Sequence, residues 1–445
     1  MRKRVGRAVA VVGIAVGMLL VGGIGLFRAV GSSPRPVVRP SAPAVTAPPV
    51  VVTGSLTEQI SILQARLRLV PNDWSAYASL GADYVQQARI TADPTYYPKA
   101  QGVLQRSLAL DTTDNFQAMT GMATLAAARH DFAGALSWGR RASAIDPANA
   151  NIHAIMGDAL VELGRYPEAF AEFQKGLDLK PKLPTYARGS YALELQGNVP
   201  AALHVMGLAL ESAGTASDSA WASNQLGELE FNSGNLDAAA DQYRRATQVD
   251  PTFIPPHAGL AKVEAALGEF GRAIADYQWV VARYPTPEYV IALGDLYTVT
   301  GRPDQAAQQY GLVHVEERLL QANGVNVDLE IALFDADHRV DLSAGLSAAR
   351  AEWARRHSIN VADALAWELH ANGRDEEALA YSNQALHLGT RNALFFFHRG
   401  MIERALGRTD AARRDLAQAL SINPHFSILW SKTAVRTLAR MGGAP

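Results

Sequence analysis

Small residues recur at a nearly fixed interval along most of the chain, each in the middle of a segment whose apolar positions follow a helical period. Successive intervals lie between 33 and 42 residues. A repeat of this size indicates a solenoid in which each unit is one antiparallel helical pair. The small residues are Gly81, Ala123, Gly157, Ser190, Gly227, Ala261, Gly294, Ala332, Ala366 and Gly400.

Three further positions keep the same register. Twelve residues after each of the last nine small residues stands an alanine: Ala135, Ala169, Ala202, Ala239, Ala273, Ala306, Ala344, Ala378 and Ala412. Seven residues after seven of them stands a glycine: Gly164, Gly197, Gly234, Gly268, Gly301, Gly373 and Gly407. Twenty-four residues after five of them stands a proline: Pro147, Pro181, Pro251, Pro285 and Pro424.

Each of these positions has a physical reason in a helical hairpin. Small side chains let two helices approach closely. A glycine after the first helix adopts the left-handed conformation that ends it, and a proline cannot continue the second helix. The pattern therefore predicts an all-α fold, an α-solenoid of about ten helix-turn-helix units over residues 55–425, with a C-terminal capping helix in residues 426–445.

Three places depart from the regular spacing. The first unit carries a Tyr- and Pro-rich insertion at about residues 93–98, and the connections near Ser217 and Asn326 are longer than the others. We expect the twist between units to change there. The capping helix is predicted at about residues 427–440, where Trp430 begins what would be a further unit.

The N-terminal segment predicts a membrane anchor. Residues 1–7 form a basic tail, and residues 8–28 form the predicted transmembrane helix, whose stretch from Ala8 to Phe27 holds no charge. Twenty apolar residues match a hydrocarbon core of about 30 Å. The basic tail should stay in the cytoplasm, which places the solenoid outside a single-pass cell membrane protein. The alternative is a signal peptide cleaved near Ala29, although the apolar run is longer than that of most signal peptides.

Residues 29–54 predict a linker, because six prolines alternate there with Val, Ala, Ser and Thr. Such a chain prefers extended polyproline geometry and would hold the solenoid away from the bilayer.

Composition narrows the function classes. The 41 basic and 43 acidic side chains nearly balance, so the basic surface typical of nucleic-acid binders is not expected. The chain has no cysteine, which excludes disulfides, thiolate metal sites and cysteine nucleophiles. No His-Glu-x-x-His, phosphate-loop or Gly-x-Ser-x-Gly motif occurs, and we expect neither an enzyme nor a cofactor.

One cluster leaves two interpretations open. Asp335, Asp337, His338 and Asp341 could ligate a divalent cation. The favoured alternative is a hydrated turn in which Asp341 caps the helix that starts near Leu342, because the glycine and bidentate glutamate of a calcium loop are missing.

The repeat resembles the tetratricopeptide family. Residues 154–170 and 224–239 carry the resemblance, with the small residue, the glycine and the alanine in the family's register. The resemblance extends over residues 73–440 and implies a protein-binding scaffold whose first helices line a concave groove.

The resemblance places the candidate groove residues by register. Polar and aromatic side chains there suit peptide capture, and the acidic ones favour a basic partner. The alternative for each aromatic residue is a place in the core between units. The candidates are Asn151, Asp158, Glu162, Tyr191, Glu194, Asn224, Glu228, Phe231, Glu288, Asp295, Asp363, Trp367, His370, Phe397 and Arg404.

These features together predict a membrane-tethered scaffold that presents its groove to a protein or peptide partner outside the cytoplasmic membrane. The alternatives are an accessory subunit that recruits substrate to a separate enzyme, and a secreted repeat protein released by signal-peptide cleavage. No nucleic acid, small-molecule substrate or metal is expected as a ligand.

Overall fold

The computed structural model describes residues 55–443, and within them the chain forms 22 helices and no strand. The predicted all-α solenoid is confirmed. Ten antiparallel hairpins, here called units 1 to 10, follow one another in chain order. Their first helices are α2 (Trp74–Thr91), α4 (Phe116–Ala128), α6 (Ala150–Glu162), α8 (Leu183–Leu195), α10 (Ala216–Asn232), α12 (Pro255–Ala266), α14 (Pro287–Val299), α16 (Asp328–His338), α18 (Ile359–Ala371) and α20 (Ala393–Ala405).

The second helix of each unit packs against the first. These helices are α3 (Tyr96–Leu110), α5 (Phe132–Ile145), α7 (Tyr166–Leu179), α9 (Val199–Glu211), α11 (Leu236–Val249), α13 (Phe270–Val281), α15 (Pro303–Ala322), α17 (Leu342–Arg355), α19 (Asp375–Ala385) and α21 (Thr409–Ile422). One helix precedes the units, α1 (Leu56–Leu69), and one follows them, α22 (Ser431–Arg440). α22 begins a few residues after the start that the sequence predicts.

The small residue in the first helix makes room for an aromatic ring from the second. A Cβ atom on Gly227 would lie 2.5 Å from the Tyr243 ring, and one on Gly294 would lie 2.3 Å from the Tyr310 ring. Both distances are far below van der Waals contact, so glycine is required for this close packing.

The residue that follows the first helix of a unit adopts a left-handed backbone conformation even where it is not glycine. All seven glycines predicted there have positive φ. In units 2 and 8 the same place is taken by His130 (φ 61°) and Arg339 (φ 55°). The requirement at this position is therefore the turn conformation, which glycine meets at the lowest steric cost.

Unit 8 departs from the predicted register. Ala344 is exposed, and the neighbouring Gly345 takes the buried place instead. The cause is the turn before α17, where Arg339 and Asp341 (φ 40°) both adopt left-handed conformations. The extra turn residue moves the second helix on by one position.

The lengthened segments extend helices rather than connections, which corrects the prediction of longer loops. α2 has 18 residues, α10 has 17 and α15 has 20, against 11 to 15 in the other helices of the ten units. Additional helical turns pair the backbone N–H and C=O groups that a loop of equal length would leave to water.

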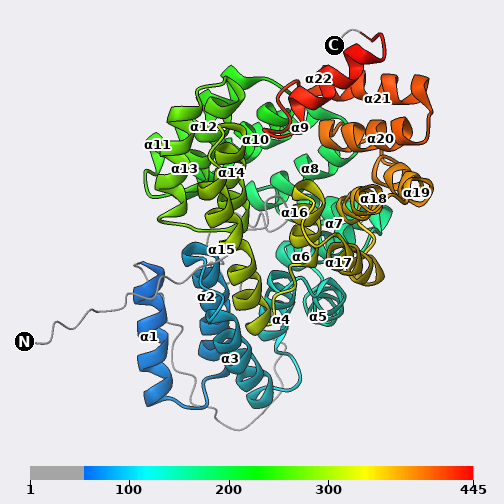
Figure 1. The fold of residues 1–445 in the computed structure, drawn as a ribbon. Coiled ribbons are helices and arrows are strands. Elements are labelled where there is room, and N and C mark those ends of the chain that lie inside the picture. The colour runs from blue at the N-terminus through cyan, green and yellow to red at the C-terminus, as the bar shows by residue number, and fades with distance from the viewer. Residues whose placement is uncertain (1–54, 444–445) are drawn as a thin grey trace, which may run out of the picture.

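The solenoid winds so tightly that the second turn of the superhelix lies against its first turn, which contains units 1 to 5. In Figure 1, α15 lies beside α2 and α4. The hydrogen bonds across the turns that involve a side chain join residues 192 to 196 positions apart, and a backbone hydrogen bond runs from Asn326 N to Arg129 O. We call these contacts the seam. They run from Tyr284 Oη to Arg89 O, His130 Nδ1 to Asn326 O, Arg356 Nη1 to Glu162 Oε2, Ile359 N to Tyr166 Oη, Thr390 Oγ1 to Leu195 O, and Asn423 Nδ2 to Phe231 O.

Helix termini explain why the seam forms where it does. The last carbonyls of an α-helix have no partner within the helix. At the ends of α2, α8 and α10 these carbonyls accept hydrogen bonds from side chains of the second turn, namely those of Tyr284, Thr390 and Asn423. Side chains from the second superhelical turn thus cap the C-terminal ends of α2, α8 and α10 in the first superhelical turn.

Hydrophobic packing continues across the seam. Val325 and Val327, on the connection between α15 and α16, share one buried cluster with Ala88 and Ala128 of units 1 and 2. A second cluster joins Tyr166 of unit 3 to Phe395 of unit 10. The two turns therefore share their cores.

The predicted N-terminal regions, residues 1–7, 8–28 and 29–54, lie outside the described residues. Within residues 55–443 no helix is both long and apolar enough to cross a membrane.

Glu316 gives a stability prediction that depends on pH. Its side chain is 2% exposed, Oε2 has no partner, and burial raises the pKa of the carboxyl to about 8. The folded state therefore keeps a proton that the unfolded state releases near pH 4.5, so this group costs stability as pH rises from about 4.5 to 8.

We expect Glu316→Leu to raise the free energy of unfolding by about 1–2 kcal/mol at pH 8, because a buried polar group is removed. The gain should be smaller at pH 5. Urea unfolding at the two pH values, followed by circular dichroism, measures this. An equal gain at both would show that protonation of Glu316 does not contribute.

Candidate partner-binding face

The first helices turn one face toward the middle of the superhelix. In Figure 1, α6, α8, α14 and α16 lie centrally, whereas α11, α13, α19 and α21 lie at the periphery. On the central side, α6, α8 and α10 enclose a pocket. Its lining residues are Asp158, Ala187, Arg188, Ser190, Tyr191, Glu194, Met206, Gln225, Glu228, Leu229 and Asn232. We call the side of the first helices that carries this pocket the inner face.

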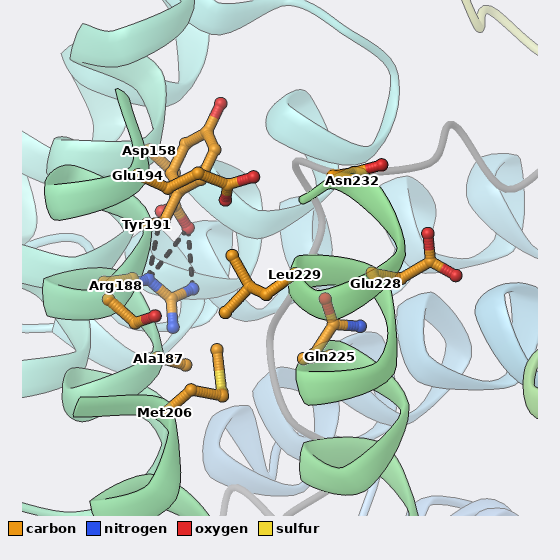
Figure 2. Close-up of a pocket in the computed structure, with 11 residues that line it drawn as sticks. Asp158, Ala187, Arg188, Tyr191, Glu194, Met206, Gln225, Glu228, Leu229 and Asn232 are labelled. Carbon is orange, nitrogen blue, oxygen red and sulfur yellow. Dashed lines mark hydrogen bonds and ion pairs between the residues drawn. The ribbon is translucent and has the colours of Figure 1, made fainter. Parts of the chain in front are cut away.

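One ion pair forms the wall of the pocket. Arg188 Nη2 lies 2.6 Å from Asp158 Oδ2, and Arg188 Nε also donates to Asp158 (Figure 2). The side chains are 9% and 14% exposed. This two-point contact fixes α6 against α8 and neutralises both charges.

Glu194 has a different environment from Asp158. Among the described residues its carboxyl has no hydrogen-bond or ion-pair partner, and its side chain points into the space between α8 and α10 (Figure 2). Burial, and after it the charge of Glu228, raise the pKa of Glu194 to about 7. Its surface is only half-buried, so the carboxyl meets confined solvent rather than close-packed core. A cationic group entering the pocket would find this carboxyl without a competing partner.

Tyr191 lies one helical turn before Glu194 and lines the same pocket. An aromatic ring beside a carboxylate suits the binding of an ammonium or guanidinium group, since both attract a cation. Leu229 and Met206 supply an apolar floor.

The acidic character continues along the inner face. Glu228 accepts hydrogen bonds from Lys262 Nζ at 2.6 Å and from Tyr243 Oη at 2.7 Å. Glu288, on α14, is accessible to solvent, but enough protein lies around its carboxyl to desolvate it in part. Burial there, then the charge of Glu228, raise its pKa to about 7. Lys262 thus pairs with Glu228, and its charge also opposes the increase in the pKa of Glu288.

Four of the sequence-predicted residues are buried in the core. Phe397 is fully buried and Phe231 is 5% exposed, so the core alternative describes both. Trp367 is also buried, and its Nε1 donates to Asp337. Asn224 is 5% exposed, and its Oδ1 has no partner.

Other candidates pair with side chains of neighbouring units. Asp363 accepts a hydrogen bond from His398 Nδ1 at 2.9 Å, and both are buried. Asp295 accepts from Tyr310 Oη at 2.9 Å and from His338 Nε2 at 2.8 Å. These carboxylates hold adjacent units together.

The remaining four candidates occupy separate places. Glu162 lies in the seam and pairs with Arg356. His370 pairs with Asp375. Asn151 lies at the start of α6, and Arg404 is exposed near the end of α20. The structure thus brings Asp158, Tyr191, Glu194 and Glu228 into one pocket, and it does not bring the other candidates into that pocket.

The acidic cluster in unit 8 does not converge on one point. Asp337 accepts from the indole Nε1 atoms of Trp367 and Trp430, both at 2.8 Å, whereas His338 turns to Asp295. Within residues 55–443 no group of three or more His, Asp or Glu side chains is arranged to hold a metal ion. Asp341 does stand at the N-cap of α17, but its side chain makes no capping hydrogen bond.

Sequence reasoning missed the seam. A signal for it existed in the proline position of the repeat. Twenty-four residues after Ala332 and Ala366, where other units carry proline, stand Arg356 and Thr390. Both donate across the seam.

Comparison with family models identifies tetratricopeptide repeats in this chain. Residues 150–183 and 393–426 match one model described as tetratricopeptide repeat, and residues 186–252 and 259–318 match another. The matched segments coincide with unit 3, unit 10 and most of units 4 to 7. The resemblance found in the sequence is thereby supported for these units.

Several solved structures are similar to this chain over part of its length. The APC/C hetero-tetramer Cut9-Hcn1 is 17% identical, with 86% of this chain and 81% of that chain covered and a TM-score of 0.39. A human IFIT1 dimer with m7Gppp-AAAA is 15% identical, with coverage of 74% and 77% and a TM-score of 0.47. A tetratricopeptide repeat protein from Parabacteroides merdae ATCC 43184 is 18% identical, with coverage of 58% and 98% and a TM-score of 0.34. The comparison with curated proteins found no match.

Proposed function

We propose that this chain is a non-catalytic scaffold that binds a basic segment of a protein partner on its inner face. The observation that carries the proposal is the Glu194 carboxyl, which has no partner within residues 55–443 and lines a pocket beside Tyr191. Glu228 and Glu288 extend the negative charge, and Lys262 offsets it only in part. Tetratricopeptide repeats are in general protein-interaction modules, which agrees with this assignment.

Fluorescence anisotropy with a labelled, unstructured lysine-rich peptide tests the proposal. A glutamate-rich peptide of equal length serves as the second probe. We expect the lysine-rich peptide to bind and the double variant Glu194→Gln/Glu288→Gln to weaken it by at least about tenfold, or about 1.4 kcal/mol. Glu211→Gln is the matched control, because Glu211 is exposed on the outer helix α9. Equal binding of both peptides, or equal loss in the control, would contradict the proposal.

The binding should also depend on pH. Because the pKa of Glu194 is about 7, its carboxylate form increases as pH rises from 6 to 8. Affinity for the lysine-rich peptide should rise over this window, and Glu194→Gln should reduce the dependence.

We further propose that residues 8–28 anchor the scaffold in the cell membrane, with the repeats on the extracytoplasmic side. The support is the uncharged stretch from Ala8 to Phe27 after a basic tail. Membrane fractionation with an alkaline wash tests this proposal independently of binding. Release as a shortened soluble protein would favour the cleaved signal peptide instead.

A further inference from the structure

The seam determines how a partner can reach the inner face. Where the successive turns of a solenoid stand apart, a partner can reach the concave face from the side, between the turns. Here the space between the turns is occupied at five levels, from Arg89 at the end of α2 to Phe231 near the end of α10. Each of units 1 to 5 contributes one level.

The seam leaves no gap at its closest levels. A Cβ atom on Gly164 would lie 2.4 Å from the carbonyl oxygen of His357, and one on Gly197 would lie 2.3 Å from that of Gly389. Not even a methyl group fits between the turns there. By contrast, Gly268 and Gly301, at the same position of units 6 and 7, have nothing within 4 Å. The close approach therefore belongs to the seam and not to the repeat.

The seam is also a continuous part of the core. Val325 and Val327 are 5% and 1% exposed, and they pack with Ala88 and Ala128 of the first turn. The ion pair between Arg356 and Glu162 is buried as well, with side chains 4% and 1% exposed. Parting the turns would bring these apolar and charged groups into water together, so the seam opens only rarely.

The inner face behind the seam shows the electrostatics of a confined space. Arg89 on α2 lies near enough to Asp158 and Arg188, on α6 and α8, for their charges to affect its pKa. Burial, the larger cause, lowers the pKa of Arg89 below its ordinary value.

From this geometry we infer that the seam closes the superhelix, and that its interior admits a partner only as a single unfolded stretch of polypeptide entering from an end. A folded domain, or a helix presented on one, is excluded from the inner face. This inference deepens the proposed function by naming the kind of partner segment. The role of the interior in binding a partner rests on the proposed function, whereas the closure of the superhelix does not.

Thiol labelling tests the closure without a known partner, because the chain has no cysteine of its own. Gln225→Cys places one thiol in the pocket on α10, and Gln248→Cys places one on the exposed surface of α11 in the same unit. Two reagents carry the same maleimide, one on an unstructured Gly/Ser peptide and one on a small folded protein. Circular dichroism verifies that each variant is folded.

We expect both reagents to label Gln248→Cys and the peptide reagent to label Gln225→Cys. The folded reagent should label Gln225→Cys at least about 100-fold more slowly than the peptide reagent does, once both rates are divided by the rates of the same reagents at Gln248→Cys. The reason is that the folded reagent could react only when the seam opens, which is rare. Adding Gly197→Ala, which forces the turns apart at one level, should raise the rate of the folded reagent.

Three results would overturn the inference. They are equal relative rates for the two reagents at Gln225→Cys, failure of the peptide reagent to reach this thiol, and a folded-reagent rate that Gly197→Ala leaves unchanged. None of them depends on whether a lysine-rich peptide binds, so closure and the proposed function can fail separately.

Discussion

Replacing Arg356 by alanine is expected to lower the free energy of unfolding by about 3–5 kcal/mol, because it leaves buried carboxylates without their counter-ion. Arg356 Nη1 lies 2.5 Å from Glu162 Oε2 across the seam, and Arg356 Nε donates to Glu352 within its own turn. Both glutamate side chains are 1% exposed. The second carboxylate oxygen, Glu162 Oε1, has no hydrogen-bond partner among the described residues.

The pKa shifts of Arg356 and Glu162 agree with the expectation that each group depends on the charge of the other. Burial alone would lower the pKa of Arg356, but the charges of Glu162 and Glu352 raise it above its ordinary value. Burial raises the pKa of Glu162, and Arg356 opposes the increase. Without the guanidinium, Glu162 would have to take up a proton or leave the seam.

Urea unfolding at pH 7 measures the effect, with Arg350→Ala as the matched control. Arg350 lies on the same helix, α17, but its ion pair with Glu377 spans 3.5 Å and both side chains are about half-exposed. An exposed pair contributes less than about 1 kcal/mol. Similar losses in both variants would mean that the buried pair does not stabilise the seam.

The seam also changes how the chain should unfold. In most solenoids each repeat contacts only its neighbours, so stability is a sum of local terms and the ends can unfold separately. Here Tyr166 of unit 3 and Phe395 of unit 10 share a cluster. Losing either end removes contacts from the other, which favours one cooperative transition for residues 55–443.

Local rules made much of the fold predictable from the sequence. The glycine position of each unit could be read from Gly164, Gly197 and their equivalents because one φ value is required there. The same reasoning did not foresee that His130 would take the position. Its ring donates to the Asn326 carbonyl across the seam, and burial, with the charge of Arg356 second, lowers the pKa of His130 to about 3. His130 and Asn326 are 196 residues apart, and no local rule of the repeat pairs residues at such a separation.

The candidate site was predictable by register but not by burial. Asp158, Tyr191 and Glu228 each directly follow the small residue of their helix, and the structure places all three around one pocket. Trp367 has the same register, yet it stacks on His398 at 4.1 Å and is buried. The sequence position fixes the direction of a side chain, and the size of the neighbouring residue decides whether a partner could reach it.

Gly197→Ala is expected to cost about 2–5 kcal/mol, of which about 1–2 kcal/mol comes from a non-glycine residue in the left-handed region and the rest from overpacking. Gly301→Ala is the matched control, since Gly301 has φ +72° against +73° for Gly197 but no atom within 4 Å of the added methyl group. The control should show only the conformational cost. The difference between the two variants in urea unfolding therefore measures the contact between the turns. Equal losses would mean that Gly389 moves aside freely, and then the seam at this level would not be the tight wall from which closure of the superhelix is inferred.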